Sequence, residues 1–458
     1  MLSDEENIMD EPISIKLISK TDEQLSSSKE IQPNISHAQI EDEQSLMHLF
    51  DDILKKKPLF IDRDRLSTSY IPETLPHREH EIVDIANILA PSLDYNIPSN
   101  IIVYGKPGVG KTAAITLVGK ELKRKATELR KHVTVLFINC QYTDTLYRIL
   151  NTIAQHFMDN LSNDRPFTGL PTDEVYAKTL SLLDTTNQVI IIVLDEVDKL
   201  KDDATLYSLT RINNDLHNTK VSIIGISNNL TFTDFLDPRV KSSLNQETIV
   251  FNPYDANQLQ DILRSRAQQA LKPDVVADEV IPLCSAIAAQ EHGDARKALD
   301  LLRVSVEIAE RKFDHKVISK HVRLAQNKIE KDRIAEVIHS LPAQERLLLH
   351  SIRILERYNR RMGNPSIMIT GELYSQYVEI SKTVQYNPVT QRRVADFISE
   401  LDALGIISAR VISKGRYGTT REIQLMIPLT ELEHILQDDE FMEEIRQVKM
   451  KNQIKLMI

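Results

Sequence analysis

The sequence predicts an α/β domain with a parallel sheet flanked by helices, then a helical domain, then a C-terminal domain of helices and a β-hairpin. Five short apolar runs alternate with helical patterns between about residues 56 and 250, which is typical of a parallel sheet with helices on both faces. Residues 256–332 show no strand pattern, and two further strand runs follow near the C-terminus. The 458 residues suit about three domains of ordinary size.

The N-terminal region differs in composition from the rest of the chain. It is rich in Glu, Asp, Ser, Gln and Asn and has no sustained apolar period, which predicts a disordered acidic tail. A short amphipathic helix is expected at 44–55, either packed on the first domain, which we favour, or bound to a partner. The expected parts are the tail at 1–43, the α/β domain at 44–252, the helical domain at 253–333, the C-terminal domain at 334–436 and a terminal helix at 437–458.

The net charge of −10 lies in the N-terminal part of the chain. Residues 1–52 contain 13 acidic and 3 basic residues, so the remainder is neutral overall. A neutral remainder is compatible with local basic patches. The net charge therefore does not exclude a protein that binds nucleic acid.

Cysteine usage and hydropathy indicate the compartment. Cys140 and Cys284 are the only cysteines and lie far apart in the sequence, which excludes a disulfide framework and a cysteine-rich zinc site and fits a reducing cytosol. No apolar run approaches the roughly 18 residues of a membrane helix. The first residues are acidic, unlike a secretion signal. We therefore expect a cytoplasmic protein with no membrane contact.

The first strand run, at Ile101–Tyr104, is followed by a glycine-rich loop and then by a helical pattern. The loop reads Gly105-Lys-Pro-Gly-Val-Gly-Lys-Thr112 and holds three of only 12 glycines in the chain. Glycines let successive backbone N–H groups converge on phosphate oxygens, and the N-terminus of the following helix favours negative charge. The pattern G-x-x-x-x-G-K-[ST] between a strand and a helix therefore predicts a phosphate-binding loop rather than a chance match in a turn.

Two side chains of this loop have specific expected roles. Lys111 would reach the β- and γ-phosphates of a nucleotide, and the Thr112 hydroxyl would bind Mg²⁺. The expected nucleotide-binding residues of the loop are Gly105, Lys106, Pro107, Gly108, Val109, Gly110, Lys111, Thr112 and Ala113.

A second buried strand run, Val189–Leu194, ends in the carboxylates Asp195 and Glu196, with Asp198 close behind. A carboxylate at the end of an apolar strand is costly unless a cation or water satisfies it. Asp195 is therefore expected to help bind Mg²⁺, and Glu196 to polarise the attacking water. The alternative is that these carboxylates cap the next helix, which suits Asp198 better than the adjacent pair.

Polar residues also follow two other strand runs. Asn228 comes after Val221–Ile226, and Asn139 comes after Thr134–Ile138; the fifth run is Glu247–Phe251. Ligands in open α/β sheets bind outside the carboxyl ends of the strands. We therefore expect these asparagines on the same edge as the phosphate loop. Asn228 would orient the attacking water or sense the γ-phosphate, unless it is simply a turn residue.

The C-terminal pattern predicts a winged helix. Thr390 is a good N-cap for a helical pattern over residues 391–401, and two strand runs follow at 406–412 and 422–426, joined by a basic, glycine-containing turn. Recognition helices usually touch DNA through their first turn, and the glycines Gly415 and Gly418 would let a tight wing approach a minor groove. The alternative is a winged helix used only for protein contact. The expected DNA-binding residues are Gln391, Arg392, Arg393, Arg410, Lys414, Arg416, Tyr417 and Arg421.

The phosphate loop, Asp195-Glu196 and Ser227-Asn228 together resemble the AAA+ ATPases. Three further stretches narrow the resemblance to the archaeal replication initiators related to origin recognition complex subunit one and cell division control protein six. These stretches are residues 70–81, residues 225–230 with 236–244, and the 391–421 region. The resemblance covers about residues 45 to 436 and implies an AAA+ domain with an α-helical lid and a C-terminal winged helix.

The resemblance also implies roles for individual residues. Pro76, His77 and Arg78 match the segment beside the adenine, and Tyr254 is counted with them among the nucleotide-binding residues. Arg296 matches a lid sensor of the γ-phosphate, with a surface ion pair as the alternative. The expected catalytic residues are Glu196, Asn228, Arg239 and Arg296.

Two assignments from the resemblance depend on interfaces with other molecules. Arg239 matches the box that carries a trans-acting arginine finger, although Lys241 is close on a similar helix face. Residues 141–159 match an insertion that contacts duplex DNA. Arg148 is the only Lys or Arg in that stretch, so contacts there would be mainly to DNA shape and backbone.

The expected function is that of an ATP-dependent initiator that binds double-stranded origin DNA and recruits the replicative minichromosome maintenance helicase. Its cofactors would be ATP or ADP and Mg²⁺, its hydrolysis slow and switch-like, and its location the nucleoid, with other initiator paralogues as possible neighbours on DNA. A nucleotide-switched transcriptional or defence regulator is the main alternative, and a remodelling ATPase acting on proteins is a third. Nucleotide-switched regulators of this kind usually carry a further sensor or repeat domain.

Overall fold

The computed structural model describes residues 58–158, 169–234, 236–244, 246–413 and 419–441, together with Phe167 and Ile445. The acidic tail expected at 1–43, the amphipathic helix expected at 44–55 and most of the terminal helix expected at 437–458 lie outside these residues. None of the helices in the described part is long and apolar enough to cross a membrane.

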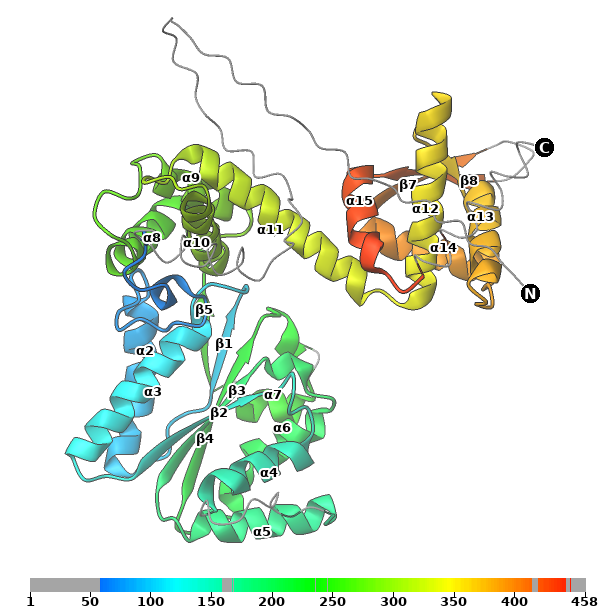
Figure 1. Ribbon diagram of the computed structural model, residues 1–458. Coiled ribbons are helices and arrows are strands. Elements are labelled where there is room, and N and C mark those ends of the chain that lie inside the picture. The colour runs from blue at the N-terminus through cyan, green and yellow to red at the C-terminus, as the bar shows by residue number, and fades with distance from the viewer. Residues whose placement is uncertain are drawn as a thin grey trace, which may run out of the picture. The chain divides into compact units, whose positions relative to one another are not determined.

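A five-stranded parallel sheet forms the centre of the first domain (Figure 1). The strand order is β2-β3-β4-β1-β5, and each neighbouring pair is parallel. The predicted parallel sheet is confirmed, and each predicted strand differs from the observed one by two residues at most in its bounds. The strands are β1 Ile101–Gly105, β2 Val133–Asn139, β3 Val189–Asp195, β4 Lys220–Ser227 and β5 Glu247–Phe251.

Helices cover both faces of this sheet, so its strands are apolar on both sides. Alternate residues of β3 illustrate the period of two, because Ile191 and Val193 pack with α2 and α3 while Ile190 and Ile192 pack with the helices of the other face. The covering helices are α2 Glu79–Leu89 and α3 Lys111–Glu128 on one face, with α4 Leu146–Phe157, α5 Thr172–Asp184, α6 Asp203–Thr210 and α7 Pro238–Leu244 on the other (Figure 1). Short 3₁₀ turns connect them at Ala90–Asp94 (η2), Val197–Lys199 (η3), Ile212–Asn214 (η4) and Phe232–Asp234 (η5).

A helical lid follows the sheet and has its own apolar core. The N-terminal segment joins this core through Leu59, Phe60 and Leu66, and the backbone N–H of Ile61 donates a 2.7 Å hydrogen bond to the carbonyl of Ala270. Residues 58–66, expected with the α/β domain, therefore pack on the lid because their apolar side chains are buried there. The lid elements are α8 Ala256–Ala270, α9 Val280–Gln290, α10 Ala295–Arg311 and α11 Ser319–Ser340, with η1 Asp64–Leu66 against α8.

The C-terminal domain has the predicted winged-helix arrangement. Its antiparallel sheet has the order β6-β8-β7, so a short third strand joins the two that were expected. The Thr390 side chain caps α14 by accepting a hydrogen bond from the backbone N–H of Arg393. The elements are α12 Ala343–Met362, β6 Met368–Ile369, α13 Thr370–Thr383, α14 Gln391–Ala403, β7 Ile407–Ser413, β8 Thr419–Leu425, α15 Leu429–Ile435 and η7 Leu436–Asp438.

Candidate functional site: a nucleotide cavity and a winged-helix surface

A cavity of about 440 Å³ lies where the sheet, the segment before α2 and the lid meet. This volume is within the range of small-molecule sites. The sheet contributes the phosphate loop and the ends of β3 and β4, and the lid contributes residues of α8 and α10. Of the expected site residues, the cavity wall contains Pro76, Pro107, Gly108, Gly110, Lys111, Thr112, Ala113, Asp195, Glu196, Asn228, Tyr254 and Arg296.

Lys111 is the most strongly perturbed basic group in this cavity. Its Nζ donates hydrogen bonds to the carbonyls of Gly105 at 2.7 Å and Lys106 at 2.8 Å, and to Asn228 Oδ1 at 2.8 Å. Burial lowers the pKa of Lys111 to about 8, against the opposing attraction of Asp195. The ammonium is thus surrounded by neutral oxygens where phosphate oxygens would stabilise its charge better.

Two glycines of the phosphate loop have backbone conformations that other residues rarely adopt. Gly108 has a φ of +75° and Gly110 a φ of +93°. A Cβ at Gly110 would lie 3.0 Å from the Tyr254 hydroxyl. The glycine pattern read from the sequence therefore meets two requirements at once, positive φ and close approach of a neighbouring side chain.

The carboxylates after β3 lie beside the first turn of α3. Thr112 Oγ1 donates a 3.0 Å hydrogen bond to Asp195 Oδ2, so a hydroxyl and a carboxylate converge at one point. Mg²⁺ prefers such oxygen donors and usually takes only one or two from the protein, with phosphates and waters completing its coordination. Thr112 and Asp195 therefore fit a magnesium ion bound with a nucleotide.

Glu196 has an unusual backbone for a non-glycine residue. Its φ of +54° lies in the left-handed region, and its N–H donates a 3.0 Å hydrogen bond to Asp195 Oδ1. Left-handed conformations at such residues are uncommon and cluster at functional sites. This geometry turns the chain directly after the strand and brings Glu196 into the cavity wall.

Asp198 holds the end of β4 in place. Its Oδ1 accepts hydrogen bonds from the Ser227 hydroxyl at 2.8 Å and from the backbone N–H of Asn228 at 3.3 Å. These two bonds connect η3 to the end of β4 and hold the backbone from which the Asn228 side chain extends. Asn139 lies opposite Asp195 in the β2–β3 register, on the same edge, but it is not in the cavity wall.

Five expected nucleotide-binding residues are not in the cavity wall: Gly105, Lys106 and Val109 of the phosphate loop, and His77 and Arg78 of the segment before α2. Arg78 is buried, and its Nε donates a 3.0 Å hydrogen bond to the carbonyl of Val109 in the phosphate loop. Its guanidinium lies 3.9 Å from the ring centroid of Tyr254. His77 Nε2 is 3.1 Å from Asp261 Oδ2 on α8. Both side chains thus have protein partners that connect this segment to the loop and the lid.

The cavity wall also contains residues that were not among the individual site residues expected from the sequence. Two segments contribute them: α8, through Ile262, Ser265 and Arg266, and the stretch before α2, part of which lies in the 70–81 region of the resemblance. The residues before α2 are Thr68, Ser69, Tyr70, Ile71, Pro72, Thr74 and Leu75. Arg266 is buried and donates hydrogen bonds to the carbonyls of Arg65 at 3.2 Å and Tyr70 at 3.0 Å. Arg266 is about 200 residues away from those acceptors in the sequence, so no local pattern identifies it.

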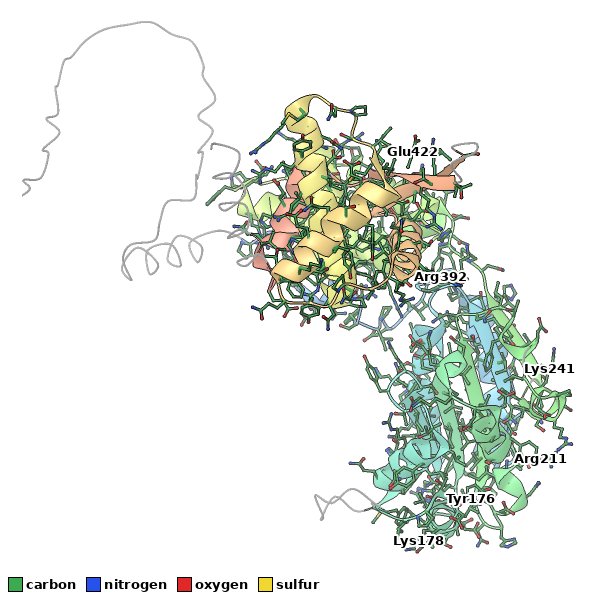
Figure 2. All side chains as sticks on the ribbon, turned by 90° about the vertical axis from the view of Figure 1, so that its right-hand side faces the viewer. Tyr176, Lys178, Arg211, Lys241, Arg392 and Glu422 are labelled. Atoms are coloured by element: carbon green, nitrogen blue, oxygen red, sulfur yellow. The ribbon has the colours of Figure 1, made fainter. Side chains whose placement is uncertain are left out.

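The arginines expected to touch nucleotide from outside the sheet are placed differently. Arg296, the second residue of α10, is exposed and in the cavity wall. Arg239 is exposed in the first turn of α7. The nearby Lys241, labelled in Figure 2, pairs with Asp234 at 3.0 Å. Neither Arg239 nor Lys241 is in the cavity wall of the described chain.

The first turn of α14 presents the expected recognition residues. Gln391, Arg392 and Arg393 are all exposed there, and Arg392 is labelled on this helix in Figure 2. Arg393 also stacks over Phe397 at 4.8 Å and pairs with Asp396 at 3.6 Å. Such an exposed pair contributes little energy and leaves the guanidinium free to exchange partners.

The wing residues fall into two groups. Lys414, Arg416 and Tyr417 lie outside the described residues. Arg410 is exposed on β7, opposite Glu422 of β8. Arg421 has protein partners, because its guanidinium donates hydrogen bonds to the carbonyl of Ala395 at 3.0 Å and to the Ser399 hydroxyl at 2.7 Å, both on α14.

Arg148, the only Lys or Arg in the 141–159 insertion, is paired within the protein. Arg148 bonds Asp144 at 2.9 Å, and Lys201 reaches the same carboxylate at 2.8 Å. The hydrogen bond and charge of Lys201 lower the pKa of Asp144. Tyr142, by contrast, is 74% exposed at the start of this stretch. The Arg148 guanidinium therefore has a carboxylate partner within the protein, and the role of this stretch in DNA contact stays a prediction.

Comparisons with known proteins identify the same three domains. Family models match an AAA domain at residues 98–231, a Cdc6 AAA+ ATPase-type lid domain at 260–327 and a CDC6 C-terminal winged helix domain at 336–435. The solved structure of the Aeropyrum pernix ORC1 protein in complex with DNA matches with a TM-score of 0.73 and 43% identity, covering 85% of this chain and 100% of that chain.

Two relatives extend the similarity over nearly the whole chain. The ORC1-type DNA replication protein of Pyrococcus furiosus is 48% identical over 416 residues, which cover 90% of this chain and 98% of that protein. The ORC1-type DNA replication protein 1 of Methanosarcina acetivorans is 50% identical over 398 residues, covering 86% of this chain and 94% of that protein. The chain therefore belongs to the family of ORC1-type DNA replication proteins.

Proposed function

We propose that this protein is an ATP-switched replication initiator that binds double-stranded origin DNA and recruits the replicative minichromosome maintenance helicase. The observation that carries the proposal is the convergence of Lys111, Thr112–Asp195 and Arg296 on one cavity shared by the sheet and the lid, in a chain that also has a winged helix. The relative from Aeropyrum pernix, solved in complex with DNA, supports the DNA-binding part.

The phosphate end of the cavity is organised for a nucleoside triphosphate. Lys111 would exchange its bonds to the Gly105 and Lys106 carbonyls for phosphate oxygens, while the Gly108 and Gly110 backbone keeps the loop open around them. Thr112 and Asp195 would hold Mg²⁺, which neutralises phosphate charge when it is bound. The segment 68–75 and α8 would accept the base at the other end.

Hydrolysis would depend on two residues at the strand ends. Glu196, turned into the cavity by its left-handed backbone, would orient and polarise the attacking water. Asn228, whose backbone is held by Asp198, would orient the same water or contact the γ-phosphate through its amide. Arg296 would contact the γ-phosphate from the lid, so loss of that phosphate would release the lid from the sheet.

DNA binding would use the exposed first turn of α14 and the basic wing. Gln391, Arg392 and Arg393 are placed to reach a groove or its phosphates. Arg239 remains the proposed arginine finger, since it is exposed on α7 while Lys241 is paired. Both roles require a second molecule, either DNA or a neighbouring initiator.

Footprinting on the organism's own chromosomal DNA tests the function as a whole. Protection of repeated elements at a replication origin, strengthened by ATP, is expected. Protection at scattered promoters with none at an origin would contradict the proposal and support a transcriptional regulator. Lys111→Ala should abolish nucleotide binding and its effect on the footprint, whereas Lys120→Ala, an exposed change on the same helix, should leave both intact.

A further inference from the structure

The N-terminus of the lid helix α10 is docked directly on the phosphate loop. The backbone N–H of Ala295 donates a 3.1 Å hydrogen bond to the carbonyl of Gly108. A Cβ built on Gly108 would lie 1.7 Å from Asp294 Oδ1, so the carboxylate of Asp294 occupies the space that a side chain would need. The loop that surrounds the phosphates and the helix that carries Arg296 are therefore in contact at one point.

Asp294 is the N-cap of this helix. Its Oδ1 accepts hydrogen bonds from the backbone N–H groups of Arg296 at 2.8 Å and Lys297 at 3.4 Å. The first turn of a helix leaves its N–H groups without intrahelical partners, so an N-cap carboxylate holds that turn together. The same oxygen that touches Gly108 thus binds the backbone of Arg296, which links the arginine to the phosphate loop through a single carboxylate.

The turn before α10, residues 291–294, is closely fitted to the segment between β5 and α8 and also approaches the phosphate loop. Gly293 has a φ of +68°, and a Cβ there would lie 2.3 Å from the carbonyl oxygen of Tyr254. His292 Nδ1 is 3.5 Å from Lys106 Nζ of the phosphate loop. A Cβ is excluded at Gly108 by the Asp294 carboxylate and at Gly293 by the backbone of Tyr254. The backbone next to Asp294 is therefore held by close contact with Tyr254, while the Asp294 carboxylate lies against Gly108.

We propose that Asp294 is a positioning residue that seats Arg296 against the phosphate loop and so makes the lid respond to the γ-phosphate. The proposal rests on the proposed nucleotide switch and adds a residue to it. Asp294 is outside the cavity wall. It acts through Arg296, because the N-cap fixes the first turn of α10 from which that side chain extends.

The test compares two changes at this position with Mg²⁺-ATP and Mg²⁺-ADP as probes. Asp294→Ala removes the cap, and we expect ATP hydrolysis to fall about tenfold while the Kd for ADP changes less than about threefold, since ADP has no γ-phosphate for Arg296 to contact. Asp294→Asn keeps a good N-cap, because Asn caps helices about as well as Asp, and hydrolysis should stay within about twofold of the unchanged protein.

A matched control separates positioning from general loosening of the lid. Asp255 caps α8 of the same lid by the same kind of bond, and it is outside the cavity wall. Asp255→Ala should therefore lower the melting temperature as Asp294→Ala does, without the selective loss of ATP hydrolysis. An equal selective loss in both alanine variants would overturn the proposal, because the effect would then belong to lid stability.

A double-mutant comparison completes the test. In an Arg296→Ala background, adding Asp294→Ala should cause no further loss of hydrolysis, since the positioned group is already absent. Additive losses, or full activity of Asp294→Ala alone, would overturn the positioning role. Failure of the proposed nucleotide switch would look different from failure of the Asp294 proposal. If the switch itself were wrong, Lys111→Ala would still bind ATP, whatever the Asp294 variants do.

Discussion

Nucleotide binding should take up a proton at Lys111 when the pH is above about 8. In the free protein burial lowers the pKa of this lysine to about 8, whereas phosphate oxygens should return it at least to its ordinary value of about 10.4. At pH 9 the free lysine is then about one-tenth protonated, so binding takes up about 0.9 proton. At pH 7 the free lysine is already charged, and binding takes up only about 0.1 proton.

The same shift predicts how affinity depends on pH. Nucleotide binds the charged form, so the Kd should rise about tenfold between pH 7 and pH 9 as the free lysine loses its proton. Isothermal titration calorimetry in pairs of buffers with different ionisation enthalpies measures the proton uptake directly. Lys120→Ala should behave like the unchanged protein. Uptake near zero at pH 9 with normal binding would refute the reasoning, because Lys111 would then be charged in the free protein.

Three further perturbations test the catalytic, DNA-binding and packing arguments. Glu196→Gln should bind ATP normally but lower hydrolysis at least about a hundredfold, and an unchanged single-turnover rate would exclude Glu196 as the group acting on water. Arg392→Ala should weaken DNA binding and reduce the slope of log K against log salt by about one. Arg421→Gln, which removes bonds to α14, should weaken DNA binding with an unchanged slope. Equal slope changes in the two variants would contradict the assignment of Arg392 to DNA contact and of Arg421 to a bond within the protein. Ile192→Ala, at a fully buried position of β3, should lower the free energy of unfolding by about 2–5 kcal/mol, measured by urea denaturation, and a loss below about 1 kcal/mol would contradict its place in the core.

Local sequence patterns were sufficient for the sheet and for the phosphate end of the cavity. Apolar runs such as Val189–Leu194 specify buried strands because neighbouring side chains point to opposite faces, both of which helices cover. The loop around Gly108 and Lys111 could be read because its residue types are dictated by backbone conformation and phosphate chemistry within eight consecutive positions. Asp195 and Glu196 followed from their place at the end of a buried strand.

The hydrogen-bond partners of individual arginines could not be predicted from local sequence patterns. Arg78 and Arg421 were both selected as contacts to ligands, yet in this structure their guanidinium groups bond the Val109 carbonyl and the helix α14 respectively. An arginine has five N–H donors, and whether they meet a ligand or a distant carbonyl depends on which segments the fold brings beside it. Arg266 shows the converse, since its acceptors lie far away in the sequence and no motif marks it.

The sequence by itself determined the domain order, the parallel sheet, the phosphate loop and the winged helix. Each of these depends on periodicity or on short patterns whose physical demands are local. Only the tertiary structure decided which of the expected basic residues have protein partners, that Arg266 is part of the cavity wall, and that Asp294 of the lid rests on Gly108. Those features depend on contacts between segments up to about 200 residues apart, where the close packing of backbone and side chains selects partners that no local pattern specifies.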